Sequence, residues 1–87
     1  MFEIKTETGE TIIQFNEYDE WEFSIDNTGY VDLLTQEDLD QGKVFGGKPI
    51  KKFATHERAL EVVQDIARVI ANSQRGKGPK FYILPEE

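Results

Sequence analysis

The chain has 87 residues and no cysteine, and its 17 acidic and 10 basic side chains give a net charge of −7. This length predicts a single domain over residues 1–87, and the missing cysteines exclude disulfides, thiol chemistry and cysteine-based zinc sites. No basic start precedes an apolar run and no stretch approaches the length of a membrane span, so we expect no export signal, no membrane contact and a cytoplasmic location.

Short strands account for the first part of the chain. Phe2–Thr6 and Thr11–Phe15 flank turn residues and predict a β-hairpin. Apolar and polar residues alternate over Trp21–Ile25, which predicts a third strand with one buried face. Turn chemistry at Asp26–Gly29 then leads to a fourth strand over Tyr30–Leu34. The four strands together indicate a meander.

The middle of the chain is less regular. Thr35–Gly42 predicts a single capped turn of helix that a glycine closes. Lys43–Phe53 is either a hairpin with its tip at Gly46–Pro49 or a loop that leads to a strand. We favour a strand over Ile50–Phe53 that leads into the following helix.

The strongest pattern in the sequence is an amphipathic helix over Thr55–Ser73. Thr55 is suited to cap its N-terminus, Gly76 follows its end and Pro79 prevents its continuation. The apolar side chains span an arc of roughly 200°, whereas a helix on one sheet usually buries a stripe a little over about 100° wide. Either the sheet curls around the helix or a second copy of the chain covers the remainder.

A closing strand over Lys80–Leu84 lies between two prolines, a setting typical of an edge strand. The elements together predict a two-layer α+β fold, with an antiparallel β-sheet of four to six strands and one long α-helix packed on one face. We also expect the chain to form a homo-oligomer.

Charge is distributed unevenly along the sequence. Residues 1–42 carry twelve acidic side chains and one lysine, whereas residues 43–87 have a net charge of +4. The acidic half is either an ordinary solvated surface or a negative surface for a partner with a basic surface. The candidate partner-binding residues are Glu17, Tyr18, Asp19, Glu20, Glu22, Asp26 and Asp32.

Two basic segments in the second half could hold an anion. Their candidate anion-binding residues are Lys48, Lys51, Lys52, Arg75 and Lys77. They suggest an alternative function, a module that sequesters a small ligand or nucleotide at a subunit interface. The acidic half would repel nucleic acid, so the sequence argues against direct nucleic-acid binding.

The sequence contains no recognisable catalytic or metal-binding pattern. Gly42–Lys48 matches G-x-x-x-x-G-K, but Pro49 stands where a phosphate-binding loop needs a hydroxyl group and an amide. His56 is the only histidine, and we expect it to pack or to cap the helix start. Without a second histidine, a thiol or a recognisable nucleophile, the sequence predicts no enzyme, no metal and no cofactor.

The second half of the chain resembles small uncharacterised proteins of phages and mobile elements of Gram-positive bacteria. The resemblance rests on IKKFATHERA over residues 50–59 and FYILPEE over residues 81–87. It implies strands, a T/S-x-E-x-A helix, a closing strand that ends in Pro-Glu, and no catalytic residues. Taken with the charge pattern, it suggests a phage-encoded inhibitor that captures a host protein, involved in defence or nucleic-acid handling, through an acidic surface.

Overall fold

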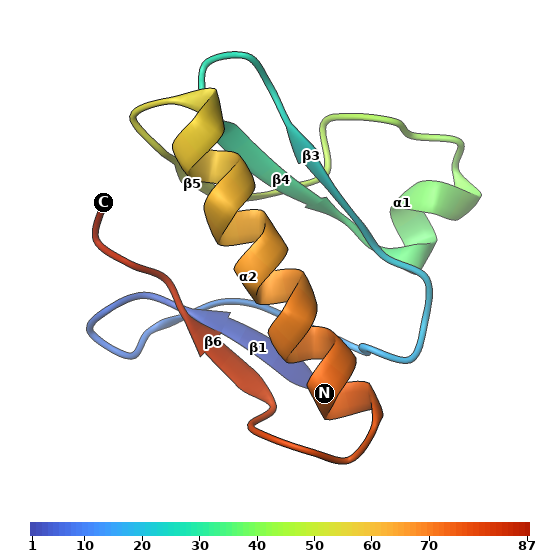
Figure 1. Cartoon of the computed structure of the whole chain (residues 1–87). Coiled ribbons are helices and arrows are strands. Elements are labelled where there is room, and N and C mark those ends of the chain that lie inside the picture. Colours follow the sequence, from blue (N-terminus) through green and yellow to red (C-terminus); the bar gives the residue numbers. More distant parts are fainter.

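Six strands and two helices follow one another in the order that the sequence predicts (Figure 1). A computed structural model describes all residues, 1–87. The loop interpretation of the middle segment is confirmed, because an irregular stretch precedes β5. The elements are β1 Phe2–Lys5, β2 Thr11–Phe15, β3 Glu22–Ile25, β4 Tyr30–Leu34, α1 Gln36–Asp40, β5 Lys48–Lys52, α2 His56–Gln74 and β6 Phe81–Ile83.

The strands form two three-stranded sheets, not the single antiparallel sheet that the sequence suggested. β1 pairs antiparallel with β2 and parallel with β6, whereas β4 pairs antiparallel with both β3 and β5. α2 connects β5 of one sheet to β6 of the other. This long helical connection lets β6 run parallel to β1. The edges β2 and β5 approach each other without a ladder, and Pro49 in β5 has no N–H group to donate to a neighbouring strand.

α2 lies across both sheets and closes a core that they share (Figure 1). Ile66 and Ile70 are fully buried, while Leu60 on the flank of the apolar arc is 41% exposed. Two sheets, rather than a second copy, therefore cover most of the wide apolar arc. The buried cluster consists of Phe2, Ile4, Ile13, Phe15, Val31, Leu33, Ile50, Phe53, Ala59, Val62, Ile66, Ile70 and Leu84.

The ends of α2 follow the predicted signals. Thr55 Oγ accepts a hydrogen bond of 3.1 Å from the backbone N–H of Arg58, and Gly76 beyond the helix has a φ of +74°. The helix is also tied to β6, because the Tyr82 hydroxyl donates to Asp65 over 2.7 Å. Burial and this hydrogen bond raise the pKa of Tyr82 to about 12.

Gly29 joins the β3–β4 turn to the segment that enters α2. Its φ is +97°, and a Cβ atom there would lie 2.7 Å from the carbonyl oxygens of Phe53 and Thr55. We expect Gly29→Ala to lower the free energy of unfolding by about 1–3 kcal/mol or more, because the new side chain would be strained at this φ and would overlap the two carbonyl groups. Urea denaturation measures the loss. Gly9→Ala is the matched control, because Gly9 also has a positive φ, +89°, but nothing lies within 4 Å of the added atom. Equal losses in the two variants would contradict a role for close packing at Gly29.

Candidate functional site

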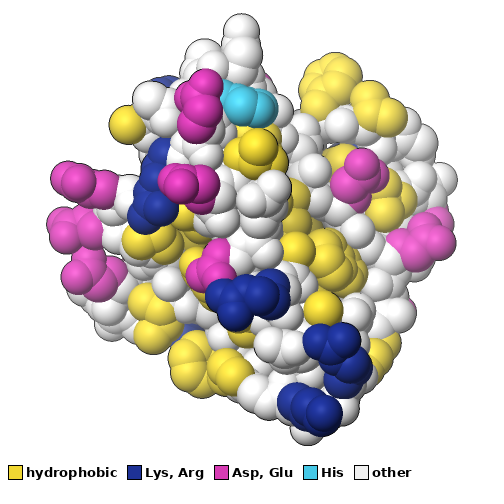
Figure 2. Space-filling view, in the orientation of Figure 1, with side chains coloured by type: hydrophobic (Ala, Val, Ile, Leu, Met, Phe, Trp, Pro, Cys, Tyr) yellow, Lys and Arg dark blue, Asp and Glu magenta, His cyan; other side chains and the backbone are white.

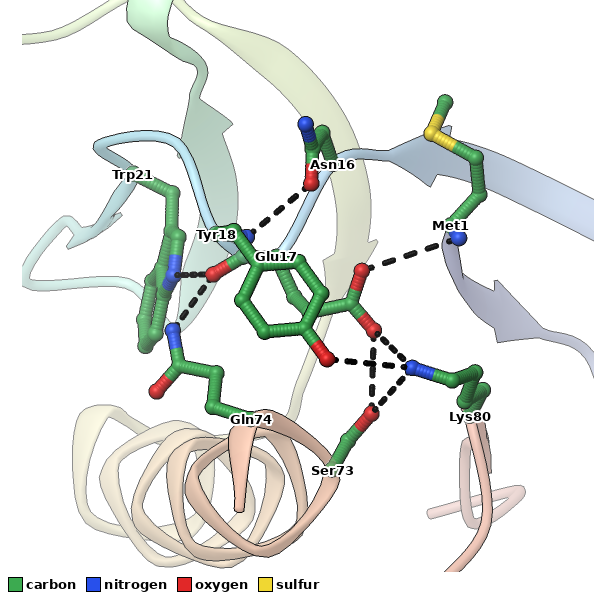
Figure 3. Close-up of polar contacts among 8 residues, drawn as sticks. All are labelled: Met1, Asn16, Glu17, Tyr18, Trp21, Ser73, Gln74 and Lys80. Atoms are coloured by element: carbon green, nitrogen blue, oxygen red, sulfur yellow. Dashed lines mark hydrogen bonds and ion pairs between the residues drawn. The ribbon is translucent and has the colours of Figure 1, made fainter. Parts of the chain in front are cut away.

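Glu17, one of the residues expected to meet a partner, lies in the turn that joins β2 to β3, and its side chain is fully buried. Figure 3 shows its polar contacts. Its Oε2 accepts hydrogen bonds from Ser73 Oγ at 2.9 Å and from Lys80 Nζ at 3.1 Å. Its Oε1 lies 3.6 Å from the amino group of Met1 and has no hydrogen-bond partner. The prediction that Glu17 contributes to an exposed acidic surface is therefore wrong, because its carboxylate is enclosed by α2 and by the segment that leads into β6.

The backbone carbonyl group of Glu17 is also hydrogen-bonded to side chains. Its carbonyl oxygen accepts from Trp21 Nε1 at 3.2 Å and from the side-chain amide of Gln74 (Figure 3). Trp21 also packs edge-to-face against Phe23 and Phe15, with ring centroids 5.7 and 6.4 Å away. Trp21 therefore belongs to the flank of the core.

We call Glu17, Ser73, Lys80 and the Met1 amino group the Glu17 cluster. Its contacts favour the ionised form of the Glu17 carboxyl group. Burial alone would raise the pKa of Glu17, but hydrogen bonds from its own backbone, Ser73 and Lys80 outweigh it and hold the pKa below its usual value. The hydrogen bond between Lys80 and the Glu17 carboxylate also raises the pKa of Lys80. Ser73 is 1% exposed and therefore closed to a substrate. The cluster ties the β2–β3 turn to the C-terminal end of α2 and is not arranged for acid–base or nucleophilic catalysis.

Three exposed carboxylates gather beside this cluster, around a hollow of about 270 Å³. Asp19 and Glu20 come from the β2–β3 turn, and Glu37 comes from α1. The backbone N–H of Glu20 donates to the Gln36 side chain over 2.9 Å, which fixes the turn against α1. No lysine or arginine lines the hollow. We call Asp19, Glu20 and Glu37 the acidic rim.

Two further predicted residues are exposed near the acidic rim. Tyr18 is 61% exposed, with Lys80 Nζ 5.3 Å from the centre of its ring. Glu22 begins β3 and is exposed. Both side chains are accessible to a partner at this end of β3.

The two remaining acidic candidates are engaged within the chain. Asp26 accepts from the Thr28 hydroxyl at 2.6 Å and from the backbone N–H of Tyr30 at 3.0 Å, and these bonds hold its pKa below the usual value. Asp26 lies beyond the opposite end of β3 from Glu20. Asp32 is half-buried, and burial raises its pKa despite a hydrogen bond from the Gly46 backbone. Neither carboxylate adds to the acidic rim.

The basic candidates do not meet within one chain. Lys52 ends β5, just before α2, whereas Arg75 and Lys77 follow the C-terminal end of α2. The 19 residues of α2 span about 28 Å and separate the two groups. Lys48 forms an ion pair with Asp38 at 3.8 Å. Lys51 Nζ donates to the carbonyl oxygen of Pro85 at 2.7 Å. An anion held by all five candidates would therefore require a second copy.

The structure also places the glycine-rich segment and the single histidine that the sequence analysis considered. Lys48 begins a strand, so the glycine-rich segment before it is not followed by the helix that a phosphate-binding loop needs. His56 is exposed and its Nδ1 lies 2.9 Å from the carbonyl oxygen of Asp26, so it contacts the β3–β4 turn instead of packing or capping. No group of three or more histidine, aspartate or glutamate side chains is arranged to hold a metal ion. Neither helix has the length and apolar character needed to cross a membrane.

The polar residues that enclose Glu17 are the main feature that sequence reasoning missed. Ser73 continues the spacing of the buried Ile66 and Ile70, and a polar residue on the apolar face of a helix is a signal that a buried polar partner exists. Lys80 gives no comparable signal, because its contact with Glu17 spans 63 positions. Comparison of the chain with protein-family models, curated proteins and solved structures found no match.

Proposed function

We propose that this protein is a non-enzymatic binding protein that captures a partner with a basic surface through the acidic rim. The main support is the convergence of Asp19, Glu20 and Glu37 on one hollow that no lysine or arginine lines. Met1 also lines the hollow, and its amino group lies 3.6 Å from the buried Glu17 Oε1. Clustered carboxylates create a negative potential that a partner's lysines and arginines would relieve. The hydrogen bond between Glu20 and Gln36 fixes the rim before binding, which lowers the entropy lost on association.

The resemblance to small phage proteins extends this proposal to a phage-encoded inhibitor of a host defence or nucleic-acid-handling protein. Proteins that handle nucleic acids present lysine and arginine surfaces to phosphates, and an acidic rim complements such a surface. The enclosed Glu17 cluster supports recognition over turnover, because its Ser73 hydroxyl is closed to solvent. The accessible Tyr18 beside the rim supplies an aromatic side chain of the kind that contributes strongly to protein interfaces.

Reversing charge on the rim tests the proposal. A partner is first captured from a bacterial lysate at low salt, and its affinity is then measured by calorimetry. We expect the double variant Asp19→Lys with Glu20→Lys to bind at least about tenfold more weakly, because a charge-complementary contact becomes repulsive. Binding of the unmodified protein should also weaken at high salt.

The control is the double variant Glu10→Lys with Glu57→Lys. Both residues are exposed and lie outside the acidic rim, and the two double variants have the same net charge. We expect the control to retain the affinity of the unmodified protein to within a few-fold. Equal losses in both variants would point to net charge alone, and unchanged affinity in the rim variant would remove the acidic rim from the interface.

A further inference from the structure

The loop between α1 and β5 presents two apolar side chains to solvent. Val44 and Phe45 are each 75% exposed. In Figure 2, hydrophobic side chains project at the upper right, over this loop. Adjacent apolar side chains with this exposure are typical of contact sites, because water is a poor environment for both. We call Val44 and Phe45 the apolar tip.

The loop that carries the apolar tip is anchored to the rest of the protein. Asp38 is 4% exposed and forms ion pairs with Lys43 at 3.4 Å and with Lys48 at 3.8 Å, on the two sides of the tip. Gly47 packs so closely on the Leu33 backbone that an added Cβ atom would overlap it. The tip is therefore held in place before any contact forms, and a partner would not have to order it.

A complementary hollow lies where the edges β2 and β5 meet without a hydrogen-bonded ladder. Its volume is about 340 Å³, and its apolar walls include Ile12 and Ile50 from these two strands. Leu84 closes it from the chain segment after β6. The carboxylates of Glu7 and Glu86 also line it. We call this hollow the seam pocket.

We propose that the apolar tip of one copy inserts into the seam pocket of a second copy. The match is both apolar and electrostatic. The half-exposed side chains of Lys43 and Lys48 flank the tip, and the carboxylates of Glu7 and Glu86 line the pocket. Lys51 also lines the pocket, where its Nζ donates hydrogen bonds to the carbonyl oxygens of Pro85 and Glu86. Neither Val44 nor Phe45 lines the seam pocket of its own chain.

Each copy therefore carries one tip and one pocket as separate surfaces. Two copies can fill each other's pockets, or further copies can add head to tail. The contact uses no residue of the acidic rim, so it is independent of the proposed function and leaves the rim free for a partner.

Sedimentation velocity of the full chain over a range of concentrations tests this contact. We expect the average mass of the unmodified protein to rise above 10.0 kDa with concentration. In Phe45→Ser the association constant should fall at least about tenfold, because hot-spot aromatics carry much of an interface. Leu60→Ser is the matched control, since Leu60 is 41% exposed on α2 and belongs to neither surface, and it should associate like the unmodified protein.

A mixing experiment separates this contact from other modes of association. Ile12→Glu should disable the pocket while keeping its own tip intact, and Phe45→Ser retains an intact pocket. At a concentration where the unmodified protein associates, each variant alone should associate at least about tenfold more weakly. A mixture of the two should form pairs that grow no further, because each pair contains only one functional tip and one functional pocket. If Ile12→Glu lacks the far-UV dichroism of the unmodified protein, the double variant Glu7→Lys with Glu86→Lys replaces it as an exposed pocket variant.

Three results would overturn the proposal. The first is an unmodified protein that remains monomeric at all concentrations. The second is a Phe45→Ser variant that associates as strongly as the unmodified protein. The third is a mixture of two folded variants that forms no pairs.

Discussion

Ile66→Asp is expected to leave the protein unfolded at neutral pH and room temperature. Ile66 is fully buried in the cluster that α2 shares with both sheets. The change removes about 1.5–3 kcal/mol of apolar burial and places an unpaired carboxylate in the core, at a further cost of several kcal/mol. A small domain has a total stability of about 5–15 kcal/mol, so this combination removes most or all of it.

Gln64→Asp is the matched control, because it introduces the same side chain two residues away on the exposed face of α2. We expect it to change the free energy of unfolding by less than about 0.5 kcal/mol. Far-UV circular dichroism and urea denaturation distinguish the two outcomes. A cooperative urea transition in Ile66→Asp at the midpoint of the unmodified protein would mean that α2 does not cover the core. Ile66→Ala should fall between the two variants, with a loss of about 2–5 kcal/mol.

The helix could be predicted because its signals are local. An apolar residue recurs on one face from Ala59 to Ile70, and Thr55 and Gly76 mark the two ends. These signals act over three or four residues, which is the range that a sequence displays directly. The strand positions were accessible for the same reason, because side chains alternate within each strand and turn residues separate the strands.

The division into two sheets could not be predicted, because it depends on contacts between distant segments. β6 follows β5 along the chain, but it pairs with β1 at the opposite end of the sequence. β2 and β5 approach each other without a ladder, and only the fold determines which edges meet. Pro49 is the single local indication, because a proline in β5 has no N–H group to donate to a neighbouring strand.

Charge in the sequence identified the region of the candidate site but not which of its residues are exposed. Asp19 and Glu20 lie on the surface beside α1, as an acidic turn suggests. Glu17 belongs to the same polar turn, yet its side chain is buried against Ser73 and Lys80, which are distant in sequence. Glu37 completes the rim only because α1 folds back on the turn.

Glu17→Gln is expected to lower the free energy of unfolding by about 1–3 kcal/mol at neutral pH. Glutamine has the shape of glutamate and can still accept a hydrogen bond from Ser73. It has no negative charge to pair with Lys80 or with the Met1 amino group, which lie 3.1 and 3.6 Å from the carboxylate. Hydrogen bonds to charged groups contribute more than neutral ones, and this difference sets the expected loss.

The pH dependence of this loss identifies the charge as its cause. Burial opposes ionisation of Glu17, but hydrogen bonds from its own backbone, Ser73 and Lys80 hold its pKa in the folded protein below the usual 4.5. A depressed carboxyl pKa stabilises the folded state above the unfolded-state value, and this stabilisation is lost as the pH falls through the folded-state value. Glutamine does not titrate, so the difference in stability between the two proteins should be constant near neutral pH and should narrow in acid below 4.5.

Urea denaturation over a series of pH values, from about 7 to about 2.5, measures this difference. Asp26, Asp38 and Asp65 also have depressed pKa values and will destabilise both proteins in acid. Because these groups are the same in both proteins, subtracting one stability curve from the other isolates Glu17. A gap that stays constant through the acid range would mean that lost packing, not lost charge, explains the variant. The Glu17 cluster would then be a shape contact instead of an ionic tie between the β2–β3 turn and α2.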